Sequence, residues 1–323
     1  MQKKLNTWQF ILDNLQASTP VVLLYVLQSS GSSPGRQGFM MAVNATGALH
    51  GSVGGGIMEY KLVELAKKKL RLQQHMQVLH LQVHNKSAAA NQSGMICSGE
   101  QTIWMYTVKH SDKASIAALI ASATAFENGT LQLTASGICF YKTVPSANYH
   151  FIKNGANDFT YHEKTGFQQQ VTIIGGGHCA LALCKIMRSL DFYITVLDDR
   201  SNLNTLQQNE YAHVKHIVKN YSQLGPIIAS GSNHYIVIMT VGYRTDAMVV
   251  QSLCHHTFAY LGLLGSKNKI AQLFADLTQQ GVSSAYLNSI KAPIGVHIKS
   301  QTTQEIAVSI AAEIIAVKNN QLR

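Results

Sequence analysis

The protein has 323 residues, of which 46% are hydrophobic and 13% are charged, and its formal net charge is +10. This composition is typical of a folded globular chain and excludes a disordered one, and the length predicts two or three domains. The basic residues are scattered. The one dense run, residues 67–71, lies at the end of a predicted helix without interleaved aromatic residues. We therefore expect no nucleic-acid partner.

The cysteines and the N-terminal residues predict where the chain resides. The five cysteines are an odd number and form no C-x-x-C pair, which is typical of free thiols in a reducing compartment. The N-terminal stretch alternates polar and apolar residues at helical spacing, unlike a signal peptide, and the apolar run 21–27 is too short to span a bilayer. A cytoplasmic protein without membrane contact is expected.

The first 150 residues predict a mixed domain of helices and strands. Apolar residues at helical spacing predict a helix over 6–17, which Pro20 ends, and the next run reads as a buried strand. Two loops, GSSPGRQG (31–38) and GSVGGG (51–56), flank a short strand at 39–44. The remaining elements follow from periodicity: helices at 57–70 and 112–127, and strands at 76–83, 101–108, 131–136 and 137–144. We expect an α+β domain over residues 1–150.

The second half of the chain has a different pattern. Residues 145–169 are polar and weakly patterned, which predicts a hairpin and a linker, with the linker at 151–169 and a domain boundary near 165. Five apolar strands follow, each with a helical segment after it: 171–175, 193–198, 213–218, 235–240 and 259–265. This alternation predicts parallel strands with crossover helices. We therefore expect an α/β fold in which residues 170–323 form a Rossmann-like, doubly wound domain.

A dinucleotide-type glycine turn opens this second half. Gly175, Gly177 and Ala180 form G-x-G-x-x-A between the first strand and a helix that starts near His178. The first glycine permits a tight turn, the second lets phosphate oxygens approach the backbone, and N–H groups at the helix start can bind a pyrophosphate. Asp198 closes the next strand about 20 residues later, where an acidic residue accepts hydrogen bonds from a ribose.

The residues after Asp198 do not decide which nucleotide the domain is expected to bind. Asp199 and Arg200 follow directly, and Arg200 could instead bind a 2′-phosphate, so the pattern fits both NAD and NADP. A purely structural glycine turn is the alternative interpretation. Hydride transfer would also need a general acid or base next to the substrate. No clear pair of that kind is present, although His178 lies inside the turn and could face a ligand.

Three loops of the first domain share a polar, glycine-rich character: 31–38, 51–56 and SGMICSGE (93–100). Their backbone N–H groups and hydroxyls, with the guanidinium of Arg36, suit an anion or a heteroaromatic ring rich in acceptors. A tight strand-to-helix connection is the alternative for 51–56. Glu59, in the first turn of the next helix, is expected to be a surface residue that the helix dipole favours.

Cys97 differs from the other four cysteines because it lies between glycines in a loop, where backbone N–H groups could stabilise a thiolate. A nucleophile, a sulfur carrier, a metal ligand and an inert loop thiol all remain open. No group of His, Cys, Asp or Glu has metal-ligand spacing, so we assign no metal site.

Together these stretches resemble the XdhC/CoxI family of molybdenum-hydroxylase accessory proteins, over nearly the whole chain. The matching segments are GSSPGRQG (31–38), GSVGGGIMEYKLVELA (51–66), GMICSGE (94–100), IIGGGHCALAL (173–183), VLDDR (196–200), YLGLLGSKNK (260–269) and APIGVHIKSQTTQEIAVSIAAEII (292–315). Seven segments in the family's order make a chance resemblance untenable.

The resemblance implies an accessory factor that binds the molybdenum cofactor (molybdopterin), supports its sulfuration and delivers it to a xanthine dehydrogenase-like molybdenum hydroxylase. A cysteine desulfurase as a further partner, a homodimer, and a contact of Cys97 with the molybdenum or its sulfur are implied in the same way. The family motifs contain Gly31, Ser32, Ser33, Pro34, Arg36, Gly54, Gly55 and Gly56 in the first half, and Gly175, Gly177, His178, Asp198, Asp199, Arg200, Gly265, Ser266 and Lys269 in the second.

The chain departs from the family pattern at a few positions. Gly35 stands where an arginine is common, and Arg36 follows one place later. Where the family usually has Cys-Gly-Gly, this chain has Cys-Ser-Gly, with Ser98 in the middle. Val241 stands where members often carry a histidine after the fourth strand of the Rossmann domain. The alternative function is an NAD(P)-dependent oxidoreductase whose small-molecule substrate binds between the two domains, and the loss of that histidine counts against it.

Overall fold

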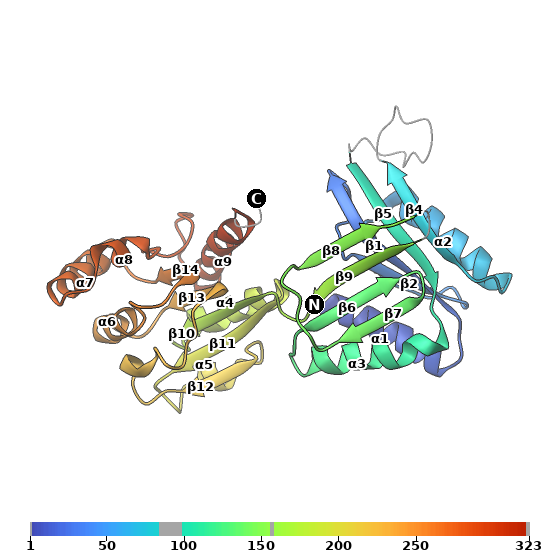
Figure 1. The fold of residues 1–323 in the computed structure, drawn as a ribbon. Coiled ribbons are helices and arrows are strands. Elements are labelled where there is room, and N and C mark those ends of the chain that lie inside the picture. Colours follow the sequence, from blue (N-terminus) through green and yellow to red (C-terminus); the bar gives the residue numbers. More distant parts are fainter. Residues whose placement is uncertain (1, 84–98, 156–157, 321–323) are drawn as a thin grey trace. The chain divides into compact units, whose positions relative to one another are not determined.

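A computed structural model describes residues 2–83, 99–155 and 158–320 (Figure 1). The chain divides into two compact units, Met1–Gly166 and Phe167–Arg323, and each is described by itself. Among the helices of the described ranges, none combines the length and the apolar character that a membrane crossing requires.

The N-terminal unit is built on a five-stranded antiparallel sheet with the order β3-β2-β1-β5-β4. Its strands are β1 (Val21–Gly31), β2 (Met40–Asn44), β3 (Leu49–Ser52), β4 (Gln77–Val83) and β5 (Gly99–Thr107). Residues 21–27 of the central strand β1 are all buried, because alternate side chains enter two different cores. This explains why the strand reads as an uninterrupted apolar run.

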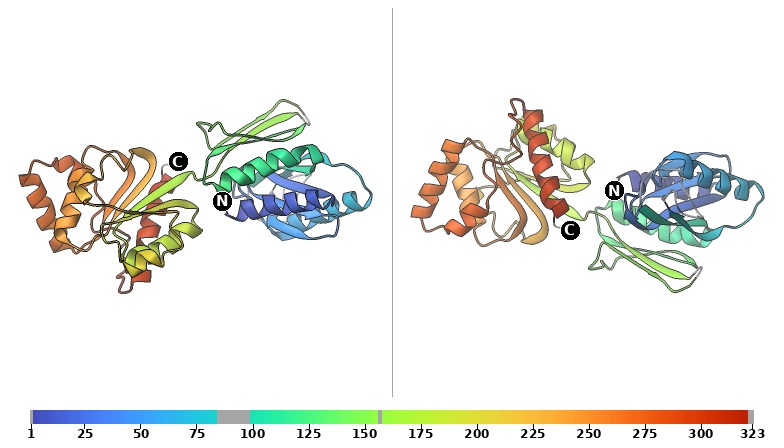
Figure 2. Two further views of the ribbon diagram at one scale, coloured as in Figure 1. Left: turned by 90° about the horizontal axis from the view of Figure 1, so that it is seen from below. Right: turned by 90° about the horizontal axis from the view of Figure 1, so that it is seen from above.

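Helices cover both faces of this sheet (Figure 2). On one face, α1 (Gln2–Gln16) and α3 (Lys113–Thr124), which follows the short η1 (His110–Asp112), share a core with Tyr25 of β1. On the other face, α2 (Gly56–Arg71) buries Leu62 and Ala66 against Leu24 of β1. The sequence predicted all three α-helices to within a few residues, because each buries an apolar stripe at helical spacing.

A second sheet of four antiparallel strands, in the order β7-β6-β9-β8, joins the core around Tyr25. Its strands are β6 (Gly129–Thr134), β7 (Gly137–Tyr141), β8 (Tyr149–Lys153) and β9 (Phe159–Thr165). Most of the segment 151–169 is therefore not a linker, because β9 inserts between β6 and β8. The alternation that marks β9 was obscured because one of its buried positions is an acidic residue, Glu163.

The buried Glu163 carboxylate connects the two sheets of this unit. It accepts hydrogen bonds from the hydroxyls of Tyr25 (2.6 Å) and Tyr161 (2.9 Å) and forms an ion pair with Lys4. Burial, together with the negative charge of Glu163, raises the pKa of Tyr25 well above its usual value. The tyrosine is therefore a neutral donor at any physiological pH.

The C-terminal unit is a parallel five-stranded sheet with the order β12-β11-β10-β13-β14. Its strands are β10 (Gln169–Ile174), β11 (Phe192–Asp198), β12 (Val214–Ile217), β13 (Gly231–Ile238) and β14 (Phe258–Leu263). In chain order this is 3-2-1-4-5, the arrangement of a Rossmann fold, with the order reversing at β10 and β13.

Helices cover both faces of the parallel sheet (Figure 1). One core contains α4 (His178–Ser189) and α9 (Thr303–Asn320), and the other contains α6 (Tyr243–Ser252), α7 (Lys267–Gln279) and α8 (Ser284–Ser289). The sequence predicted a helical segment after each parallel strand, but two of the strands are followed by only a short turn of helix. Only α5 (Asn204–Gln207) lies between β11 and β12, and only the 3₁₀ turn η2 (Tyr221–Gln223) between β12 and β13.

We expect Glu163→Ala to lower the free energy of unfolding of the N-terminal unit by about 3 kcal/mol, because it removes the carboxylate that accepts from two buried tyrosine hydroxyls and pairs with Lys4. Urea denaturation followed by tryptophan fluorescence measures this, since both tryptophans, Trp8 and Trp104, lie in this core. The control is Glu64→Ala, which removes a partly exposed ion pair with Lys67 on the surface of α2 and should change stability by less than about 0.5 kcal/mol. Equal stability of the two variants would contradict the assignment.

Candidate functional site

In the N-terminal unit, the loops at 31–38 and 51–56 pack directly against each other. A Cβ added to Gly35 would lie 2.0 Å from the carbonyl oxygen of Val53, and one added to Gly54 would lie 2.6 Å from the amide nitrogen of Gly35. A Cβ added to Gly99, the first residue of β5, would lie 2.6 Å from the amide nitrogen of Ser33. The structure thus brings together the loops at 31–38 and 51–56, with Gly99 of β5 beside the first of them; residues 93–98 of the third loop lie outside the described residues.

The glycine run itself is required by its backbone conformation. Gly54, Gly55 and Gly56 have φ angles of 131°, 75° and 74°, in the region that residues with a side chain rarely adopt. They join the end of β3 to the start of α2. The run is therefore a tight strand-to-helix connection, which is one of its two interpretations, and its anion-binding interpretation depends on the backbone amides of this loop.

These amide groups are already bound by a carboxylate of the same chain. Oε2 of Glu59, in the first turn of α2, accepts hydrogen bonds from the amides of Val53 (2.8 Å) and Gly55 (3.0 Å) and from the hydroxyl of Ser52 (2.7 Å). Glu59 lies in the first turn of α2 as expected and is partly exposed, but its carboxylate is folded back into the loop. An anion that binds these amides must replace it.

The other predicted residues of this region divide into buried and exposed groups. Ser33 is buried and donates to Oε1 of Gln101 (2.8 Å), whose amide group in turn donates to Gln82. Ser32 and Arg36 are exposed, and Arg36 also donates to the carbonyl of Gly31 (3.2 Å). Sequence reasoning did not identify the two glutamines, because nothing in a strand pattern marks an inward-facing amide. Cys97 lies outside the described residues.

In the C-terminal unit, the glycine turn lies between β10 and α4. Gly175 has φ +107°, and a Cβ there would lie 2.3 Å from the carbonyl oxygen of Met239, so this position requires glycine. Gly177 has φ −71° and no atom within 4 Å of an added Cβ. Neither conformation nor packing therefore requires glycine at 177. Since no side chain caps α4 there, its first N–H groups are available to a phosphate.

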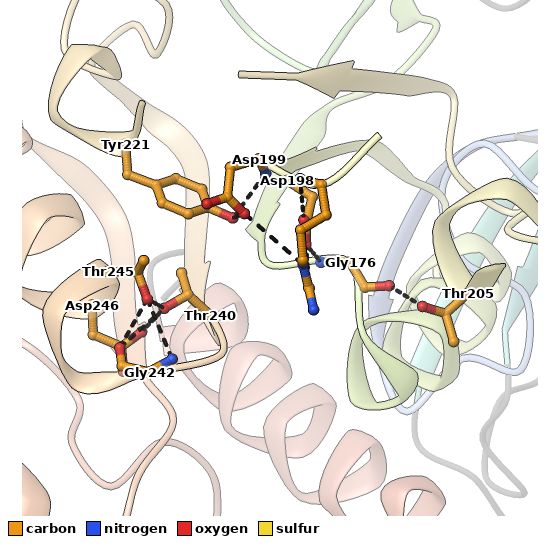
Figure 3. A network of polar contacts seen from close by, with 10 residues as sticks. Gly176, Asp198, Asp199, Thr205, Tyr221, Thr240, Gly242, Thr245 and Asp246 are labelled. Carbon is orange, nitrogen blue, oxygen red and sulfur yellow. Dashed lines mark hydrogen bonds and ion pairs between the residues drawn. The ribbon is translucent and has the colours of Figure 1, made fainter. Parts of the chain in front are cut away.

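Asp198, at the end of β11, fastens this turn (Figure 3). The side chain is fully buried, and Oδ2 accepts hydrogen bonds from the amide of Gly176 (2.6 Å) and from Nη2 of Arg200 (2.8 Å). Oδ1 accepts from the amide (2.9 Å) and Nε (2.8 Å) of Arg200. Burial alone would raise the pKa of Asp198, but the hydrogen bonds from Arg200 and Gly176 outweigh it and hold the pKa below its usual value.

A second polar group lies at the same edge of the sheet, after β13 (Figure 3). The fully buried Asp246 of α6 accepts from the hydroxyl of Thr240 (2.5 Å) and from Nζ of Lys269 (2.6 Å). Ser266 follows Gly265 and caps α7 by accepting from the amide of Lys269 (3.3 Å). Lys269 therefore neutralises the buried carboxylate of Asp246, and the sequence did not single out Asp246 or its other partner, Thr240.

The polar groups around Asp198 and Asp246 both lie at the carboxyl ends of parallel strands, where Rossmann folds bind their ligands. His178 is the exposed first residue of α4. Within the described residues, no three His, Cys, Asp or Glu side chains are placed to hold a metal ion. The strand order, the glycine turn and the acidic end of β11 define the C-terminal unit as a Rossmann domain.

Comparison with known families identifies both halves of the chain. The family model described as XdhC Rossmann domain matches residues 171–314, and the model described as XdhC and CoxI family matches residues 15–82. The chain belongs to the XdhC and CoxI family, which confirms the resemblance drawn from its motifs.

Individual proteins are similar over different lengths. The uncharacterized protein YqeB of Escherichia coli (strain K12) is 23% identical over 306 residues, which cover 94% of this chain and 45% of that protein. A probable xanthine dehydrogenase subunit of Bacillus subtilis (strain 168) is 33% identical over 82 residues, 25% of this chain and 23% of that protein. The matches thus span less than half the length of both curated relatives.

The fold also matches a solved structure. A crystal structure described as a xanthine dehydrogenase from Bacillus halodurans has a TM-score of 0.70 and 20% sequence identity. The similarity covers 97% of this chain and 96% of that chain. The two chains share a fold.

The lowered pKa of Asp198 predicts an acid-sensitive glycine turn. A carboxylate whose pKa is depressed by folding stabilises the protein above its unfolded pKa of about 4, and this contribution is lost as the pH falls through the folded value. We expect the C-terminal unit of the wild type to lose stability below about pH 4. Asp198→Asn should be less stable at pH 7 and less dependent on pH in that range.

Hydrogen-exchange mass spectrometry of peptides from 170–200, recorded along a urea titration at several pH values, measures the stability and its pH dependence. Glu210→Gln, an exposed carboxylate of the same unit, is the matched control and should follow the wild type. If Asp198→Asn kept the stability and pH dependence of the wild type, the assigned role of Asp198 would be wrong.

Proposed function

We propose that this protein is an accessory factor for a xanthine dehydrogenase-like molybdenum hydroxylase, which binds the molybdenum cofactor and supports its sulfuration and insertion. The observation that carries the proposal is the presence of both XdhC family domains in one chain. The choice of client is supported by the relative described as a probable xanthine dehydrogenase subunit. A cysteine desulfurase is the partner expected to provide sulfur.

The N-terminal loops have groups that fit a ligand with a phosphate and a pterin ring. Ser32 and Arg36 are exposed donors beside the glycine run, and a guanidinium binds phosphate through paired N–H groups. Nε2 of the fully buried Gln82 has no hydrogen-bond partner within the described residues, so a donor remains for a ring acceptor. We assign the phosphate to Arg36 and Ser32 rather than to the amides that Glu59 occupies.

When bound, the cofactor would supply the molybdenum centre that the client enzyme uses. This chain's part is to hold it and to keep its polar groups satisfied until delivery, which requires no catalytic group. The role of Cys97 near the molybdenum or its sulfur rests on the family motif alone.

The alternative of an NAD(P)-dependent oxidoreductase has less support. Such an enzyme needs a side chain that exchanges a proton with its substrate. At the end of β13, the carboxylate of Asp246 is bonded to both Thr240 and Lys269. Val241 is 75% exposed and has no titratable group.

Retention of the isolated molybdenum cofactor by the full chain tests the proposal. After gel filtration, molybdenum and pterin fluorescence should elute with the wild type. Arg36→Ala should retain about tenfold less, because a charge-assisted hydrogen bond contributes roughly 1.5–3 kcal/mol. Arg71→Ala, another exposed arginine of the same unit, is the control and should behave as the wild type. If the wild type did not retain the cofactor and instead oxidised NADH with a small carbonyl compound, the proposal would be wrong.

A further inference from the structure

Helix α2 has exposed apolar side chains on the side that faces away from the sheet. The helix covers one face of the N-terminal sheet (Figure 1), and it packs an apolar stripe against that sheet: Leu62, Val63, Ala66 and Leu70. Four apolar side chains on the opposite side are exposed instead: Ile57 (60%), Tyr60 (66%), Leu65 (38%) and the C-cap residue Leu72 (55%). Single exposed apolar side chains are ordinary, but four on one helix face are typical of an interaction surface.

The same side of α2 is positively charged. Lys61, Lys68 and Arg71 are exposed there, and none of the three forms an ion pair with another described residue. Glu64, the acidic residue among them, is already paired with Lys67 (3.1 Å). These three cations and the four apolar side chains make up what we call the outer face of α2.

The order of these side chains along the helix argues against a membrane as the partner. Apolar and basic residues alternate along one ridge, from Ile57 through Lys61, Leu65 and Lys68 to Leu72. A helix that lies on a membrane instead keeps its apolar residues on one side and its basic residues on another. Since the continuous apolar stripe of α2 is already buried against the sheet, the outer face does not have that pattern.

A nucleic acid and a second copy of this chain also fit the outer face poorly. The backbone of a nucleic acid would bind the three cations but would leave Ile57 and Leu65 without an apolar contact. A second copy related by a two-fold axis would bring the cations of one face against those of the other. The formal net charge of +10 on each chain opposes that association further.

A protein with an acidic surface fits both components of the outer face. Protein interfaces combine apolar contacts at their centre with charged groups whose sign matches the partner's. Carboxylates of such a partner would pair with the three cations, and Tyr60 is of a residue type that dominates the energetics of many interfaces. The outer face is also continuous with the candidate ligand site, because Ile57 directly follows Gly56, the last residue of the glycine run.

We infer that the outer face of α2 is the docking surface for a partner protein with an acidic surface, and that this partner is the hydroxylase that receives the ligand. The identity of the partner rests on the proposed function. Docking there brings the partner next to the exposed Ser32 and Arg36, because the loop at 51–56, from which α2 starts, packs against the loop at 31–38.

Surface plasmon resonance of the full chain against the purified, cofactor-free molybdenum hydroxylase of the same organism tests this inference. The wild type should bind, and its affinity should fall at least about tenfold when the salt concentration rises from about 0.05 M to about 0.5 M. Lys61→Glu/Lys68→Glu should bind at least about tenfold more weakly and lose most of the salt dependence, and Tyr60→Ala should also lose at least about tenfold. Both variants should keep the melting temperature and the cofactor retention of the wild type, because the changed side chains are exposed.

Matched changes on the second sheet of the same unit are the control. Lys142→Glu/Lys153→Glu reverses the charge of two exposed lysines, and Tyr141→Ala removes a tyrosine that is 46% exposed. Both control variants should bind the hydroxylase as the wild type does.

Three results would overturn the inference. The first is a wild type that does not bind the hydroxylase. The second is a pair of α2 variants that bind it as tightly as the wild type. The third is a wild type that binds phosphatidylglycerol vesicles or single-stranded RNA, with that binding lost in Lys61→Glu/Lys68→Glu. Retention of the cofactor would confine the failure to the docking surface, whereas loss of retention as well would contradict the proposed function.

Discussion

Each unit of this protein depends on one carboxylate that binds the amide groups of a glycine turn. Glycines let the chain turn sharply, but they leave backbone N–H groups without partners, and a buried N–H without a partner costs about 1–3 kcal/mol. Glu59 satisfies the amides of Val53 and Gly55, and Asp198 satisfies that of Gly176. Both turns therefore hold their shape through contacts within the chain itself.

This arrangement determines where ligands can bind. A carboxylate that binds the amides of a turn removes those amides as a ready anion site, so only the groups beside the turn remain accessible. In the N-terminal unit these are Ser32 and Arg36, which are exposed. In the C-terminal unit they are the uncapped start of α4 and the exposed Asp199. The two glycine clusters thus differ in the groups that they leave accessible.

The sequence predicted the elements whose periodicity reflects burial. The parallel strands β10 and β13 of the Rossmann unit and the central strand β1 contain apolar runs because both of their faces are covered. The segment around β9 was misread as a linker because Glu163 occupies one of its buried positions. That residue is tolerated there only because distant residues, Lys4 and Tyr25, supply its partners, and sequence spacing does not reveal them.

The sequence could predict where the site residues lie along the chain, but it could not predict which residues they contact. The motif located Asp198, yet its bonds to Arg200 depend on side-chain directions that a motif does not encode. Glu59 fits a helix-dipole role in sequence, and only the fold shows that α2 turns it back onto the preceding loop. Asp246 was missed for the same reason, because its partner Lys269 is 23 residues away.

Amide hydrogen exchange by NMR tests most directly whether the chain's own carboxylates hold both turns. In Glu59→Ala, the amides of Val53 and Gly55 should exchange at least about tenfold faster than in the wild type, with Gly176 unchanged. In Asp198→Asn, the effect should appear at Gly176 and leave Val53 and Gly55 unchanged. Exchange at the wild-type rate at all three amides in both variants would contradict the account.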